Sequence, residues 1–160
     1  MKDRRVLRGR IPTIQYGGLT NIVVDDGNFN DGWRVTKFYV SVPAVHDSSL
    51  GSFDCAAVLA THRDAIPNPT LTTVIKWNWD DRRQFAWTSI ELNGDTTIGA
   101  WSEGVIDPSH IIIRDLWIGI TAQTATSTRD FNYMIELERV TLNDNQAVMA
   151  LVQEVAQDVN

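Results

Sequence analysis

Apolar and polar residues alternate along several stretches of this chain, which is the pattern of β-strands with one buried face. The clearest case is 131–138, where apolar and polar side chains alternate. Met134 is the one exception, an apolar residue on the polar face. The stretch 111–121 is rich in β-branched and aromatic residues and is apolar on both faces. A small, polar segment at 122–130 separates the two, so we predict a long antiparallel hairpin. A strand that is apolar on both faces is expected to be central in a sandwich or covered by a partner.

Further stretches of strand character occur along the chain: 20–24, 33–42, 53–61, 71–79, 85–92 and 96–101. The stretches 71–79 and 85–92 flank a charged segment at 80–83, which indicates a second hairpin. The alanines of 53–61 also permit a short helix, and 17–19 has the composition of a turn. About eight strands with turn signals every 8–12 residues or so predict an all-β fold. We expect an antiparallel β-sandwich, with a jelly roll as its topology.

The last stretch changes from the period of a strand to that of a helix. Between residues 145 and 159 the helical spacing predicts one apolar stripe, formed by Val148, Leu151, Val152, Val155 and Val159. Asn143 and Gln146 have the spacing of a capping box. A helix of about four turns needs a docking surface to persist. Its own sandwich and a neighbouring subunit are the alternatives, and we expect the neighbour, so the stripe is a predicted interface.

The charge distribution divides the chain more sharply than its net charge of −6. The first ten residues carry a net charge of +4 and the remaining chain −10. The basic residues are Lys2, Arg4, Arg5, Arg8 and Arg10. We therefore expect a basic N-terminal arm at 1–10, a β-sandwich domain at 11–142 and a helical tail at 143–160. The arm is either a solvated terminus or a contact to nucleic acid through its phosphates.

Composition limits the other possibilities. A chain of 160 residues suits one domain with a real core. Cys55 is the only cysteine, so neither an internal disulfide nor a cysteine-based zinc site is expected. The chain contains no apolar run of the roughly 20 residues needed to span a bilayer, and its first residues lack the apolar core of a secretory signal. We therefore expect that the protein does not insert into a membrane. We also expect that it is synthesised inside a cell.

Two patterns suggest ligands. Asp26, Asn28 and Asn30 have the alternate spacing of a calcium loop, but the twelfth position is Lys37 rather than glutamate. We therefore predict an Asx-rich turn at 25–32 and no metal. Six tryptophans are many for this length, and Trp77, Trp79 and Trp87 have the spacing of an aromatic platform for sugar rings. The alternative is that these rings fill the core or an interface.

No catalytic motif supports an enzyme. The histidines are scattered, and no phosphate loop, nucleophile elbow or zinc-protease motif occurs. Glu103 and Asp107 are a pair of carboxylates of the kind that glycoside hydrolysis needs, but any acidic β-protein offers such pairs. We predict a protein without catalytic activity and without a cofactor.

The arm at 2–10, the strand set at 20–142 and the tail at 143–160 together resemble a single-jelly-roll coat protein of a small virus. The resemblance is one of architecture and includes no diagnostic motif. It implies a shell or virion-surface subunit that is made in the host-cell cytoplasm and assembles with itself. It also implies that the arm faces packaged nucleic acid. The main alternative is a carbohydrate-binding module that uses the tryptophans.

Overall fold

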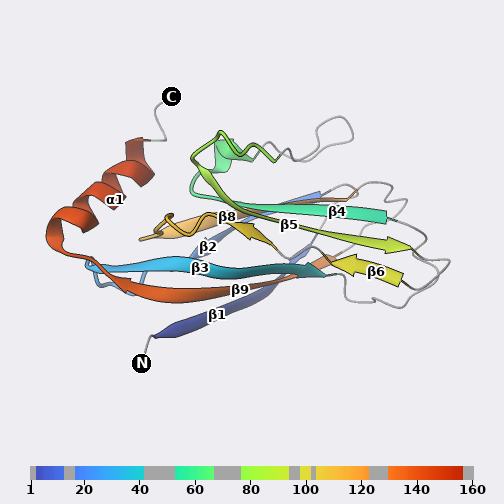
Figure 1. Cartoon of the computed structure of the whole chain (residues 1–160), viewed down its shortest axis with the longest axis horizontal. Helices are drawn as coiled ribbons and strands as arrows, with labels where there is room; N and C mark the ends of the chain where they lie inside the picture. The colour runs from blue at the N-terminus through green and yellow to red at the C-terminus, as the bar shows by residue number, and fades with distance from the viewer. Residues whose placement is uncertain are drawn as a thin grey trace.

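The computed structural model describes residues 3–12, 17–41, 53–66, 77–93, 98–101, 104–122 and 130–156. These residues form two antiparallel sheets packed face to face and one α-helix, so the predicted all-β sandwich is confirmed (Figure 1). The first sheet has the order β1 (Arg4–Pro12), β9 (Asp130–Thr141) and β3 (Asp31–Ser41). The second has the order β2 (Gly17–Val23), β8 (Asp115–Ala122), β4 (Phe53–Ala60), β5 (Gln84–Asn93) and β6 (Ile98–Trp101).

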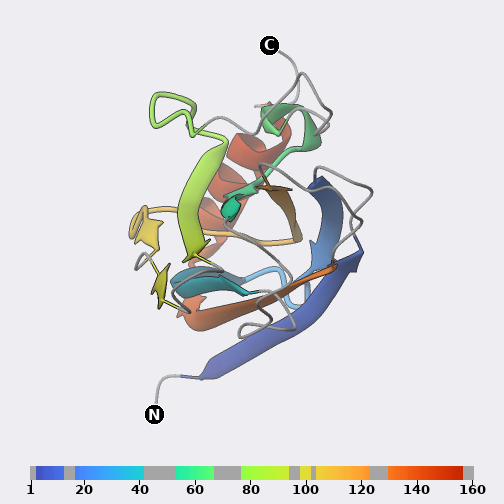
Figure 2. The same cartoon turned by 90° about the vertical axis from the view of Figure 1, so that its right-hand side faces the viewer.

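Three further elements occur in the described ranges. Strand β7 (Val105–Ile106) pairs with β5, and the 3-10 turn η2 (Arg63–Ala65) follows β4. Helix α1 (Asp144–Ala156) lies at one end of the sandwich, as both views show (Figures 1 and 2). The predicted stretch 53–61 is therefore a strand and not a helix, and residues 17–19 belong to β2 rather than to a turn.

The main core lies between the two sheets and follows the alternation of the strands. In β9 the side chains of Phe131, Ile135 and Leu137 are buried, as the sequence pattern predicts. They pack in one cluster with residues of β8 such as Ile118 and Ile120. Burial of these apolar surfaces is the main favourable contribution to folding.

The predicted hairpin between 111–121 and 131–138 is wrong, because β8 and β9 lie in different sheets. Strand β8 pairs with β2 and β4, while β9 pairs with β1 and β3. The physical reason is that β8 is apolar on both faces and occupies a central position. Its outer residue Trp117 packs on a second cluster formed by Val58, Ala60, Ala65, Ile66 and Trp87.

The predicted separate arm is corrected for residues 4–10, which belong to edge strand β1. This strand pairs with β9 along its whole length, from Arg4 opposite Glu138 to Pro12 opposite Asp130. Leu7 and Ile11 face the core, and Gly9 lies where a Cβ atom would meet the ring of Tyr133. The net charge of the segment 1–10 does not indicate that apolar residues facing inward alternate with basic residues facing outward.

Helix α1 begins with the predicted cap. The Asn143 amide donates to Gln146 Oε1 at 3.1 Å, and the Gln146 amide donates to Asn143 Oδ1 at 2.9 Å. These two bonds form a reciprocal capping box. The helix therefore begins at Asp144, one residue before the predicted start.

The docked face of α1 differs from the predicted stripe. Ala147 is fully buried and packs with Ile113 and Leu142, and Leu151 is partly buried in the same cluster. Glu154 is also buried, and its carboxylate accepts a hydrogen bond from the Ile113 amide at 2.8 Å. Thus α1 docks on its own sandwich through a face that includes Leu151 of the predicted stripe but none of its described valines.

The predicted valines point away from this contact. Val148, Val152 and Val155 are exposed, and Val159 lies outside the described residues. The small side chains of Ala147 and Ala150 allow α1 to approach the sandwich closely. The sequence pattern had instead predicted that the larger valines are buried. The chain offers two apolar faces on one helix, and only one of them is covered by its own fold.

Replacing a docked alanine tests this orientation. Ala147→Gln should lower the free energy of unfolding by about 2 kcal/mol, because it forces a larger polar side chain into a buried site. Asn145→Gln, two residues away on the exposed side, should change it by less than about 0.5 kcal/mol. Urea unfolding of both variants measures the difference. Equal effects would show that α1 does not dock through Ala147.

Candidate functional site

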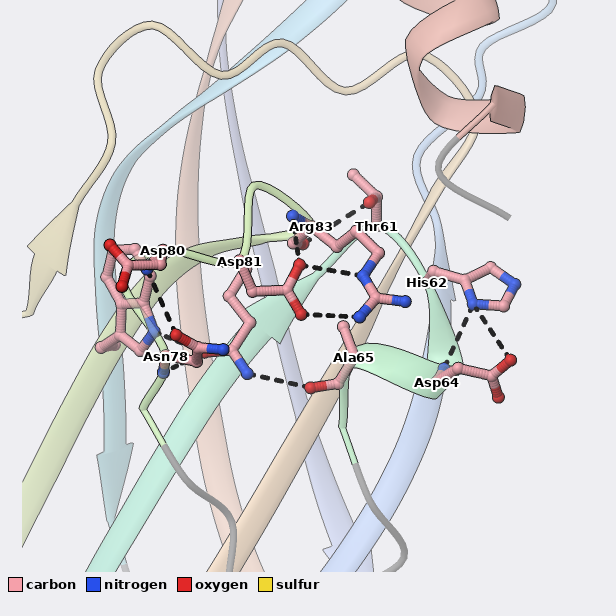
Figure 3. A network of polar contacts seen from close by, with 10 residues as sticks. Thr61, His62, Asp64, Ala65, Asn78, Asp80, Asp81 and Arg83 are labelled. Carbon is pink, nitrogen blue, oxygen red and sulfur yellow. Dashed lines mark hydrogen bonds and ion pairs between the residues drawn. The ribbon is translucent and has the colours of Figure 1, made fainter. Parts of the chain in front are cut away.

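A polar network joins the turn that precedes β5 to the segment that follows β4 (Figure 3). Arg83 donates from Nε and Nη2 to the two carboxylate oxygens of Asp81, at 2.9 and 2.8 Å. This bidentate pair holds the pKa of Asp81 below its ordinary value. The Thr61 amide donates to the Arg83 carbonyl at 2.9 Å, which ties the two segments together.

Gln84 is the centre of this network. Its Nε2 donates to the Ala65 carbonyl at 2.9 Å. Its Oε1 accepts hydrogen bonds from the Asn78 amide and from the Trp87 indole, each at 2.9 Å. The side chain is buried, so these three bonds satisfy a polar group that would otherwise be costly. They fix the base of the turn that carries Trp79.

The structure separates the three tryptophans of the predicted platform. Trp87 is only 6% exposed and belongs to the outer core cluster, whereas Trp79 is 65% exposed. The two ring centroids are 6.0 Å apart, with planes tilted by 48°. Trp77 is partly exposed on the same turn and lies outside the strand predicted for it, while 71–76 are outside the described residues. The three rings therefore do not form one flat platform.

A cavity of about 580 Å³ lies between this turn and α1. Trp79, Arg82 and Gln84 line one side of it. Asp107, Ser109 and His110 line it after β7, and α1 contributes Gln146, Met149, Gln153 and Glu154. An exposed indole beside carboxylates, amides and a hydroxyl offers both an apolar face and hydrogen-bonding groups, which is the chemistry of a small polar ligand site.

The titratable groups that line the cavity differ in the direction of their pKa shifts. Burial lowers the pKa of His110 to about 4, and its ring stacks on Phe85 with centroids 4.3 Å apart. Burial raises the pKa of Glu154, although its bonds to Ile113 and Arg114 oppose this. Burial would raise the pKa of Asp107, but hydrogen bonds from Ser109 bring it below the ordinary value. Near neutral pH, His110 is thus neutral and Asp107 is charged.

The predicted nucleic-acid residues divide into two groups. Arg4, Arg8 and Arg10 are exposed on the outer face of the three-stranded sheet. Arg5 faces inward, where Nη1 donates to the Val24 carbonyl at 3.0 Å and the guanidinium lies 5.9 Å from the Trp33 ring centroid. Lys2 lies outside the described residues. Arg5 is therefore a structural residue.

Two basic residues that the sequence did not single out join this surface. Arg34 and Lys37 of β3 lie in register with Glu138 and Glu136 of β9. Only the register of the three strands β1, β9 and β3 shows that these residues share one face with the N-terminal arginines. A local sequence pattern does not contain this information. The basic groups of the N-terminal segment are thus part of a wider sheet face.

The predicted Asx-rich turn at 25–32 is confirmed. The amides of Gly27, Asn28 and Asn30 each donate to the side-chain oxygen two residues before them, at 2.7, 3.0 and 3.2 Å. Gly27 has a φ of 83°, a conformation that favours glycine. Asp31 is buried against Arg139, which holds its pKa below the ordinary value. Within the described ranges, three or more metal-ligating side chains do not cluster anywhere.

Comparisons with known proteins do not identify a family. No protein-family model matches the chain, and no curated protein matches it. In the part of the chain that the structure describes, no helix has the length and apolar character needed to cross a membrane. The geometry of the chain itself therefore carries the functional inference.

The buried histidine makes a pH prediction. Unfolded histidine titrates near 6.5 and folded His110 at about 4, so between these values the unfolded chain binds a proton that the folded chain excludes. This group should therefore lower the free energy of unfolding by about 3 kcal/mol as pH falls from about 6.5 to 4. His110→Phe keeps an aromatic ring against Phe85 and removes the titration. Urea unfolding of both proteins across this range should show a smaller loss for the variant, and identical slopes would refute the assignment.

Proposed function

We propose that this protein is a structural subunit that assembles with copies of itself, of the kind found in the shell or on the surface of a small virus. The exposed apolar face of α1 carries the proposal. Val148, Met149, Val152 and Val155 are 51%, 64%, 56% and 46% exposed. They adjoin one another on a helix whose opposite face is already docked, and contiguous apolar patches of this kind mark protein contacts.

A second copy of the chain is the occupant that we propose for this face. A self-complementary apolar stripe packs on its own copy about a two-fold axis without any further component. Four side chains are fewer than the 20–30 or so residues that each partner contributes to a stable interface. The assembly therefore uses α1 together with other parts of the surface.

The strand order supports a jelly-roll topology, which we include in the proposal. The first strand pairs with the last, β1 with β9, and the second with the last but one, β2 with β8. Strands β4 and β5 are paired neighbours in the chain. This order is expected when one long antiparallel hairpin wraps around itself, and jelly rolls occur in viral coat proteins. By the same reasoning, the proposed location is the virion, after synthesis in the host-cell cytoplasm.

Removing the outward valines should prevent assembly. In the double variant Val152→Gln/Val155→Gln we expect a monomer that melts close to the wild-type temperature, because the changed side chains are exposed. Gln153→Ala on the same helix, where the side chain lines the cavity instead of the valine face, is the matched control and should assemble as the wild type does. Light scattering after size exclusion measures mass, and negative-stain microscopy shows whether particles form. A monomeric wild type at high concentration, or an assembling valine variant, would contradict the proposal.

A carbohydrate-binding module is the second candidate, favoured by the cavity beside Trp79. An exposed indole can stack on the apolar face of a sugar ring. The Asp107 carboxylate and the amides of Gln146 and Gln153 line the same cavity and are suited to hydroxyl groups. This site differs from the predicted platform, because Trp87 contributes only a buried wall.

A glycan array followed by calorimetry tests this candidate. If the wild type binds a saccharide, Trp79→Ala should weaken binding by about tenfold or more, which corresponds to about 1.4 kcal/mol. Trp77→Ala is the matched control, since Trp77 is on the same turn but does not line the cavity. Absence of glycan binding by the wild type, or equal losses in both variants, would exclude the cavity as a sugar site.

A further inference from the structure

The outer face of the three-stranded sheet carries cross-strand rows of side chains that the register defines. At one end Arg4, Glu138 and Arg34 form a row, and the next contains Val6, Glu136 and Lys37. The third row contains Arg8, Met134 and Tyr39, and the fourth Arg10, Asn132 and Ser41. The first two rows contain a carboxylate each, and the third and fourth contain none. These two rows therefore carry Arg8 and Arg10 without a carboxylate of their own, and the following row holds Asp130 opposite Pro12.

A groove of about 620 Å³ lies over these last two rows. Arg8 and Arg10 of β1 line one side of it, and Tyr39 and Ser41 of β3 line the other. Asn132 and Met134 of β9, the strand between them, also line the groove. The two arginines are thus opposite an aromatic ring across a hollow of ligand size.

The two guanidinium groups are available to an anion. Arg8 is exposed and forms no ion pair with any described residue. Arg10 lies 3.3 Å from Asp130, but their side chains are 60% and 41% exposed. Such an exposed pair is weak and is easily exchanged for a phosphate. Lys37 pairs with Glu136 at 3.3 Å in the neighbouring row and does not line the groove, so Arg8 and Arg10 are the primary anion contacts there.

We propose that this groove binds a single strand of nucleic acid, with Arg8 and Arg10 on neighbouring phosphates and Tyr39 against a base. Side chains two residues apart on a strand are about 7 Å apart, comparable with the spacing of phosphates along an extended single strand. A basic track beside an aromatic side chain is the arrangement that binds unpaired bases without reading sequence. A duplex keeps its bases stacked inside and does not present them to Tyr39.

This inference goes beyond the proposed assembly and does not depend on it. The groove belongs to the sheet formed by β1, β9 and β3, whereas the proposed subunit contact belongs to α1. It also differs from a free basic arm, because it uses β3 and β9 and leaves Arg5 out. One subunit contains the whole site.

Fluorescence anisotropy with a short fluorescein-labelled oligothymidine tests the site on the full chain. Arg8→Ala/Arg10→Ala should weaken binding by about tenfold or more. Tyr39→Ala should weaken it by about tenfold, and Tyr39→Phe should retain binding because the ring is kept. Arg63→Ala/Arg82→Ala removes the same charge from connections of the other sheet and should leave affinity nearly unchanged. Circular dichroism and thermal melting of each variant exclude unfolding as the cause.

Salt and competitors complete the test. The log–log slope of affinity against salt should be about −1.4, for the two phosphates on Arg8 and Arg10 at about −0.7 each. A duplex of the same length and heparin should compete less well than the unlabelled single strand. Failure of the wild type to bind, equal losses in the control variant, or equal competition by duplex or heparin would overturn the inference. Binding must also survive in Val152→Gln/Val155→Gln, since its loss there would show that one subunit is insufficient.

Discussion

The organisation of this protein depends on the need to cover both faces of β8. Its inner residues Leu116, Ile118 and Ile120 form the main core with the three-stranded sheet. Its outer residue Trp117 lies over a second cluster that Ile66 and Trp87 complete. Just before the strand, Ile113 packs under α1. Three different parts of the chain therefore cover the apolar surface of β8 and the residues just before it: the three-stranded sheet, the segment with Ile66 and Trp87, and helix α1.

The positions of the cavity and of the exposed valines follow from the way in which both faces of β8 are covered. The segment after β4 and the turn before β5 are held together by Gln84, and this fixes Trp79 at the rim of the cavity. Helix α1 forms another wall of the same cavity because it is needed over Ile113. Once Ala147 and Glu154 face inward, the spacing of a helix forces Val148, Val152 and Val155 outward. The surface that we propose for assembly therefore follows from how the core is closed.

Local pattern was sufficient for those features that depend on neighbours in the sequence. The alternation in β9, the strand at 53–60 and the capping box at Asn143 were predictable because each is decided within a few residues. Pairing was not predictable in this way. Residues 111–121 and 131–138 have the pattern of a hairpin, yet burial of β8 on both faces places the two strands in different sheets.

The candidate sites were only partly predictable for the same reason. Sequence identified Arg8, Arg10 and Trp79, but their partners Tyr39 and Asp107 come from distant strands and loops. On α1 the sequence offered two apolar faces, and only the fit of small alanines against Ile113 decides which one docks. The central claim is therefore that the face left outside, around Val152, is the contact to a second copy.

Thiol reactivity at Val152→Cys tests this claim most directly. The native Cys55 is buried, and burial raises its pKa, so it should stay unreactive. The new thiol should react rapidly in dilute protein and progressively more slowly as the protein concentration rises. A thiol placed by Gln153→Cys on the same helix, where the side chain lines the cavity instead of the valine face, should react at a constant rate. If the thiol at position 152 also reacts at the same rate at every concentration, the outward face of α1 is not a contact between copies.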